Sequence, residues 1–202
     1  MEIIKEISED ELILLFLKSE LYSNRFGKQI TDQIQKDNQN ENIITNPDLS
    51  KETQNVYRRR LLEKYRGYGI NKHLFDNFPE KITWHRYLIT KSELEKVKYI
   101  NYDYWNKLSS ETRLPVIAAR NIKNGLEIFN VSNNNFINAS KYIKSGGEFP
   151  PIILVCKSLE DDIVILEGHL RVTAYFLEPE CIPYKLEVVL GVSKDFANWK
   201  LY

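Results

Sequence analysis

Residues 163–177 combine two hydrophobic patterns in one short stretch. Residues 163–166 are consecutive apolar side chains, mostly β-branched, which is typical of a buried strand. Over residues 168–177, Leu, Ala, Tyr and Phe recur at helical spacing. The pattern therefore predicts a strand that runs directly into a helix, with Glu167-Gly168-His169 at the turn between them.

Around this stretch, short apolar runs alternate with polar turns. The acidic turn Glu160-Asp161-Asp162 predicts that the strand at 163–166 returns antiparallel to the apolar run before it. The pattern predicts strands at 126–131, 150–155 and 184–190, and a helix at 136–144 that ends at Ser145-Gly146-Gly147. We expect an α+β domain over residues 116–202, with a small mixed β-sheet and packed helices.

Residues 1–115 carry mainly helical patterns and are expected to form a separate N-terminal region. Ser8 and Glu11 form one capping box, and Thr90 and Glu93 form another ahead of Leu94, Val97 and Ile100. Residues 37–50 are rich in Asn, Asp, Gln and Pro, which predicts a polar linker or mobile loop. Helices are expected at 8–22, 27–35 and 51–65, a short one from Ser109, and a strand at 82–89.

Composition places the chain among ordinary globular proteins. Its 202 residues are 43 % hydrophobic and 28 % charged, and 28 basic residues balance 28 acidic ones. A neutral total provides no strong field for nucleic acid or an anionic membrane, so any such binding needs a local patch. Cys156 and Cys181 match no metal-ligand spacing, and the start of the chain is unlike a secretory signal. We therefore expect a cytoplasmic protein.

The turn at 167–169 brings together groups suited to an anion. Gly168 allows a tight backbone turn and a close approach by another molecule. The helix that follows would point its first N–H groups and the positive end of its dipole at that molecule. His169 and Arg171 would add side chains that bind phosphate. This pattern predicts a phosphate- or nucleotide-binding site formed by Gly168, His169 and Arg171.

Chemistry at this turn and a purely structural role are both open. Glu167 would act as a general base or share Mg²⁺ with phosphates, and His169 would act as an acid or base near neutral pH. Arg171 would stabilise charge during phosphoryl transfer. In the structural alternative, Glu167 pairs with Arg171, Gly168 serves only the turn, and His169 caps the helix.

The order of these segments resembles the ParB/sulfiredoxin-like domain, also described as the ParB N-terminal-like nuclease domain. The features that carry the resemblance are Pro-Pro-Ile-Ile-Leu-Val, an acidic turn, the box Glu-Gly-His-Leu-Arg in its strand-turn-helix setting, and a later Ile-Pro before a last strand. It covers about residues 121–191. The resemblance implies that the turn holds nucleotide phosphates, either CTP or ATP with Mg²⁺, and that Gly168 and Arg171 take the family's positions. Other members of the family act as nucleases or occur with mobile elements, so the resemblance also implies one of these roles.

Three departures from the family narrow what the resemblance implies. His169 occupies the position of the sulfiredoxins' reactive cysteine, so sulfinic-acid reduction is not expected. Leu170 replaces a residue that is often His or Arg, which removes one phosphate contact. The sequence to Tyr202 shows neither a second phosphate and metal motif nor a helix-turn-helix region, so a CTP-gated DNA clamp is not expected.

A basic cluster in the N-terminal region offers a different class of function. Arg58, Arg59 and Arg60 follow Tyr57 and precede further aromatic residues, a mixture that can hold phosphates and stack on bases. A solvated helix face explains the same pattern. The two hypotheses are therefore a nucleotide- or phosphate-binding protein, with phosphoryl-transfer, NTPase or nuclease activity, and a non-catalytic DNA-associated or regulatory protein of a mobile element, plasmid or phage.

Overall fold

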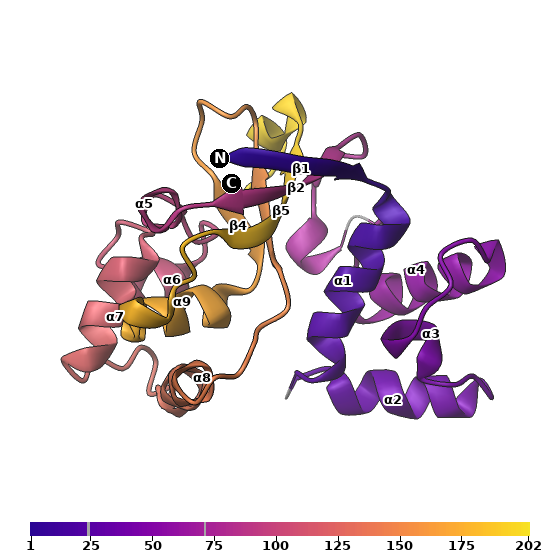
Figure 1. Cartoon of the computed structure of the whole chain (residues 1–202), viewed down its shortest axis with the longest axis horizontal. Helices are drawn as coiled ribbons and strands as arrows, with labels where there is room; N and C mark the ends of the chain where they lie inside the picture. Colours follow the sequence, from indigo (N-terminus) through magenta and orange to yellow (C-terminus); the bar gives the residue numbers. More distant parts are fainter. Residues whose placement is uncertain (24, 71) are drawn as a thin grey trace. The chain divides into compact units, whose positions relative to one another are not determined.

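One mixed β-sheet organises most of the residues that the structure, a computed structural model, describes; these are residues 1–23, 25–70 and 72–202. Its strand order is β1-β2-β5-β3-β4 (Figure 1). The strands are β1 (Glu2–Ile7), β2 (Thr83–Ile89), β3 (Ile152–Cys156), β4 (Val164–Glu167) and β5 (Leu186–Val192). β5 is antiparallel to β2 and parallel to β3, whereas β3 and β4 are antiparallel. The expected α+β class with a small mixed sheet is confirmed.

The chain divides into two units. The sheet unit comprises residues 1–6 and 81–202, and the helical unit comprises residues 7–80. The boundary expected between residues 115 and 116 falls inside the sheet unit, because β2 contributes residues 83–89 to the sheet. The amino-terminal strand β1 also belongs to this sheet, although the whole helical unit follows it in sequence.

Alternate side chains of the strands build a core on one face of the sheet, as the two-residue period of a strand requires. Helix α9 (His169–Leu177) packs against α7 (Pro115–Lys123) and α8 (Asn134–Lys144) beside this face (Figure 1). Residues 171–177 of α9 are all buried, so this helix is an interior element. The strand residues in the core are Tyr87, Ile89, Ile152, Leu154, Cys156, Ile165, Leu186, Val188 and Leu190.

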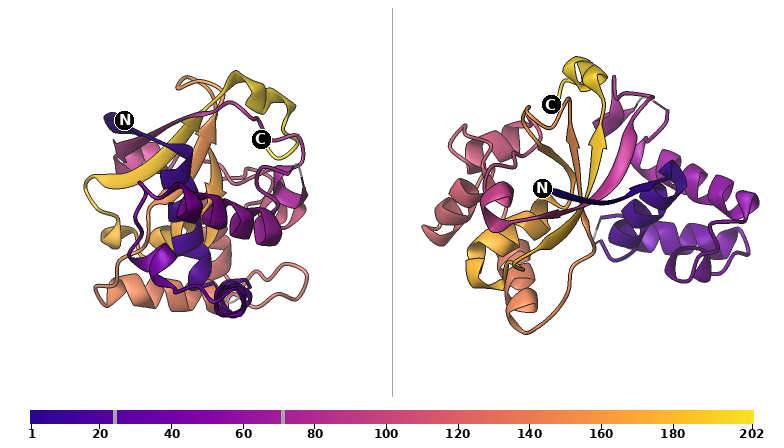
Figure 2. Two further views of the ribbon diagram at one scale, coloured as in Figure 1. Left: turned by 90° about the vertical axis from the view of Figure 1, so that its right-hand side faces the viewer. Right: turned by 45° about the horizontal axis from the view of Figure 1, so that its top comes forward.

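Shorter elements complete the sheet unit. They are α5 (Lys91–Leu94), α6 (Asp103–Leu108), and the 3-10 helices η2 (Pro179–Cys181) and η3 (Lys194–Asn198). The end of the chain lies beside the turn between β3 and β4 (Figure 2): the Tyr202 hydroxyl accepts a hydrogen bond from the Lys157 backbone N–H at 3.2 Å and donates one to the Asp162 carbonyl.

The helical unit contains α1 (Glu9–Leu21), α2 (Gly27–Lys36), α3 (Asn42–Thr45), α4 (Glu52–Arg66) and the 3-10 helix η1 (His73–Phe75). Ser8 caps α1 by accepting a hydrogen bond from the Glu11 backbone N–H at 3.2 Å, as predicted. The segment expected to be a polar linker at 37–50 instead contains α3 and lies within this unit. Ile43 and Ile44 are buried there, which gives the segment an apolar anchor that its polar composition conceals.

Three local predictions in the sheet unit were wrong. Residues 126–131 form a turn rather than a strand: Phe129 and Asn130 have positive φ, and the Val131 N–H donates to the Ile128 carbonyl at 3.0 Å. The helix expected to begin at Ser109 is replaced by a left-handed turn at Ser110 and Glu111. The capping box at Thr90 is present, but α5 ends at Leu94, before Val97 and Ile100.

Within the part of the chain that the structure describes, no helix is both long enough and apolar enough to cross a membrane.

Candidate functional site

The strand-turn-helix at the centre of the sequence pattern is present. β4 ends at Glu167, α9 begins at His169, and Gly168 between them has φ +108° and ψ 19°. L-residues rarely adopt this left-handed backbone conformation, so glycine is required for the chain to leave the sheet and enter the helix within one residue. The Val172 N–H donates to the Gly168 carbonyl at 2.9 Å and closes the first turn of α9.

Arg171 folds back over this glycine. It is only 7 % exposed, and a Cβ atom placed on Gly168 would lie 2.9 Å from its Nη2 atom. The same Nη2 lies 3.6 Å from Glu167 Oε1 and donates a hydrogen bond to the Pro151 carbonyl at 3.3 Å. Arg171 therefore links the start of α9 to the end of β4 and to the segment that leads into β3.

His169 belongs to a group of near-parallel rings. Its imidazole stacks on Trp105 of α6, with ring centroids 4.9 Å apart and planes 19° apart, and also lies 5.8 Å from Tyr99. Trp105 and Tyr99 stack at 4.5 Å. The Tyr99 and Thr173 hydroxyl oxygens are 2.6 Å apart, and Thr173 donates to the His169 carbonyl at 2.7 Å. These contacts fix the half-buried imidazole beside the amino-terminal end of α9.

Two opposite side-chain charges, on Glu167 and Arg171, and the amino-terminal end of α9 set the electrostatic environment of the turn. Burial raises the pKa of Tyr99, so its hydroxyl stays protonated and adds no negative charge beside His169. The first turn of α9 contains no acidic residue, and its N-cap residue, Gly168, has no side chain to accept hydrogen bonds from the helix. The Glu167 carboxylate is the negative charge that accompanies Arg171.

Glu167, Gly168 and Arg171 lie in mutual contact at the turn, whereas the His169 ring lies against Trp105 and Tyr99. The Glu167–Arg171 pair is the contact that the structural alternative describes. Sequence reasoning missed Trp105, Tyr99 and Pro151 as neighbours of the turn. Pro151 contributes only its backbone carbonyl, which has no sequence signal. Trp105 and Tyr99 belong to an aromatic-rich segment whose distance in sequence hides its contact with His169.

The arginines of the basic cluster, residues 58–60, do not form one exposed basic surface. Arg58 is fully buried and donates to the Ile43 carbonyl at 2.8 Å and to the Asn55 side chain. Arg59 pairs with Asp10 at 2.8 Å, and Arg60 is exposed. Successive helical residues point in different directions, so Arg58 serves the interior of the unit and only its two neighbours reach the solvent.

Two further findings bear on the chemistry. Among the described residues, no group of three or more His, Cys, Asp or Glu side chains is arranged to hold a metal ion. Burial raises the pKa of Cys156 to about 12, so this thiol is protonated at neutral pH.

No family model, curated protein or solved structure matches the chain.

Proposed function

We propose that the chain binds a phosphate-bearing ligand, of the nucleotide class, at the turn formed by Glu167, Gly168, His169 and Arg171. The observation that carries the proposal is the glycine at the amino-terminal end of α9 with a guanidinium folded over it. A helix start without a side-chain cap favours an anion through its N–H groups and its dipole. A guanidinium adds a planar set of donors that matches phosphate oxygens.

The ion pair between Glu167 and Arg171 sets the condition for binding. At 3.6 Å the carboxylate already neutralises the guanidinium, so an entering phosphate has to replace Glu167 as the partner of Arg171. A nucleotide that arrives with Mg²⁺ lowers this cost, because the released Glu167 carboxylate can turn towards the cation, which prefers oxygen ligands. We therefore favour ATP or CTP with Mg²⁺ over inorganic phosphate alone.

A thermal-shift experiment tests the proposal. Inorganic phosphate, pyrophosphate, ATP and CTP, each with and without Mg²⁺, are added to the whole chain. Ligand that binds only the folded state at about 100 times its Kd adds about 2.7 kcal/mol of stability, which raises Tm by several degrees. We expect at least one Mg²⁺-nucleotide to raise Tm in this way.

Two conservative variants locate the effect. His169→Phe keeps an aromatic ring against Trp105 but removes both ring nitrogens, and Arg171→Lys keeps the charge but removes the planar fork of donors. Both should fold and lose most of the ligand-induced shift. The matched control is His85→Phe, which changes a half-buried histidine on β2. No shift with any compound, or a shift that both variants retain in full, would overturn the proposal.

A further inference from the structure

Strand β1 is separated in sequence from the other strands of its sheet, because the whole helical unit lies between β1 and β2 along the chain. Residues 1–6 belong to the sheet unit, and residue 7 begins the helical unit. β1 lies at one edge of the sheet, next to β2 only, and residues 2–6 are all exposed. Ile3 and Ile4 are 56 % and 47 % exposed, so little apolar surface holds this strand to its neighbour.

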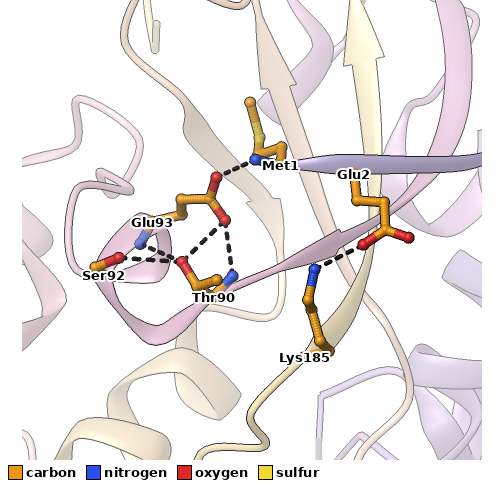
Figure 3. Close-up of polar contacts among 6 residues, drawn as sticks. All are labelled: Met1, Glu2, Thr90, Ser92, Glu93 and Lys185. Atoms are coloured by element: carbon orange, nitrogen blue, oxygen red, sulfur yellow. Dashed lines mark hydrogen bonds and ion pairs between the residues drawn. The ribbon is translucent and has the colours of Figure 1, made fainter.

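Charged contacts hold β1 to other elements of the sheet unit (Figure 3). The Met1 ammonium group bonds to Glu93 Oε1, and Lys185 Nζ lies 2.6 Å from Glu2 Oε2. At the other end of the strand, Glu6 Oε2 lies 3.9 Å from His85 Nε2. The start of β1 is therefore held by two charged contacts, in addition to the backbone pairing of the strand with β2.

Glu93 serves two elements at once. Its Oε2 atom accepts hydrogen bonds from the Thr90 backbone N–H at 2.7 Å and from the Thr90 hydroxyl at 3.0 Å, which completes the capping box of α5. Its Oε1 atom faces the Met1 ammonium group (Figure 3). The cap of α5 thus fixes the carboxylate in the position from which it holds the start of β1.

We propose that β1 is a detachable strap, held by charged contacts, that opens while the rest of the sheet stays folded. The chain passes between the sheet unit and the helical unit twice, at residues 6–7 and at residues 80–81. When β1 is paired, both of these connections lead to a strand that is held in the sheet. When β1 opens, the connection at 80–81 is the one that remains anchored to the sheet. Conditions that weaken charged contacts therefore control how often β1 leaves the sheet.

The physical argument rests on screening. Exposed ion pairs weaken in salt, whereas the buried core of the sheet does not depend on them. Between about 0.1 M and about 1 M NaCl the screening length falls from about 10 Å to about 3 Å. Opening of β1 should therefore rise with salt, while opening of the buried strand β5, whose residues 188–190 are fully buried, should not.

Hydrogen exchange of the whole chain, read residue by residue, tests the strap. The amides of β1 that pair with β2 should exchange about 3- to 10-fold faster in the double variant Glu93→Gln/Lys185→Ala, because the exposed Glu2–Lys185 pair and the partly buried Met1–Glu93 pair are both lost. Glutamine retains an oxygen that accepts from Thr90, so the cap of α5 survives. High salt should accelerate the wild type towards the same rate, while β5 amides act as the internal reference.

Lys144→Ala is the matched control, because it removes an exposed ion pair of the same unit, with Glu178 at 2.8 Å, that does not touch β1. It should leave β1 exchange unchanged. The strap is overturned if β1 amides exchange as slowly as β5 amides at both salt concentrations, or if the double variant accelerates both strands equally. In either case β1 would open only when the whole sheet unfolds.

Discussion

At the scale of single residues, Gly168 and Arg171 depend on each other. The left-handed backbone at Gly168 excludes most side chains, and the space that a Cβ atom would occupy is taken by the Arg171 guanidinium. Arg171 is correspondingly buried and reaches both Glu167 and the Pro151 carbonyl. One glycine therefore serves both the change in chain direction and the packing of a charged side chain.

This dependence predicts a large cost for Gly168→Ala. The alanine would have a strained backbone and a methyl group in contact with Arg171, so we expect a loss of about 2 to 4 kcal/mol in the free energy of unfolding. Gly125→Ala is the matched control: Gly125 has φ +83° and no atom within 4 Å of the added Cβ.

The control should lose only about 1 kcal/mol for backbone strain. Urea unfolding of both variants measures the difference. Equal losses in the two variants would show that Arg171 does not fill the space above Gly168.

Arg58 shows what residue types alone cannot reveal. Three consecutive arginines suggested a surface for nucleic acid, but Arg58 lies in the interior, bonded to a backbone carbonyl and an amide side chain. The carbonyl belongs to Ile43 of α3, which lies 15 residues earlier in the sequence. The contact joins distant parts of the chain, and no local pattern encodes it.

At the scale of elements, strong periodicity was a good guide, whereas the exposed strand β1 and the helix α7, which packs against α9, were missed. The strand-turn-helix at 163–177 and the helices α1, α2, α4 and α8 follow their hydrophobic patterns closely. β1 was missed because Glu-Ile-Ile-Lys-Glu-Ile does not alternate and is exposed. α5 ends early because the chain after it pairs with β4, where the Lys98 carbonyl accepts from the Ile165 N–H at 2.8 Å.

The contacts of β1 predict a dependence on acid. Burial raises the pKa of Glu93, but hydrogen bonds from the Met1 ammonium group and Thr90 outweigh it, and the net pKa lies below 4.5. The hydrogen bond from Lys185 lowers the pKa of Glu2. A carboxylate with a lowered pKa in the folded state stabilises that state above the unfolded value and loses this contribution as pH falls.

We therefore expect β1 to open progressively as the pH falls below about 4.5, before β5 does. Hydrogen exchange corrected for the intrinsic pH dependence measures this opening. Glu93→Gln should remove part of the acid response. An opening of β1 that is independent of pH in this range would contradict the role of these two carboxylates.

At the scale of the whole molecule, the division into units could not be inferred from local patterns. The expected boundary at 115/116 separated helical from alternating sequence, whereas the sheet unit recruits β1 and β2 from the helical part. The candidate site was predicted as far as it is local, from Glu167 to Arg171. Its stacked neighbours Trp105 and Tyr99 come from a distant segment, and tertiary packing alone places them there.

The most direct test of phosphate binding at the Gly168 turn is a nuclear magnetic resonance titration of the ¹⁵N-labelled chain with pyrophosphate, ATP and CTP in the presence of Mg²⁺. We predict saturable shifts that are largest for the backbone amides of residues 168–171, since these lie at the start of α9. Absence of saturable shifts, or shifts centred on Arg59 and Arg60 in the helical unit, would contradict this account.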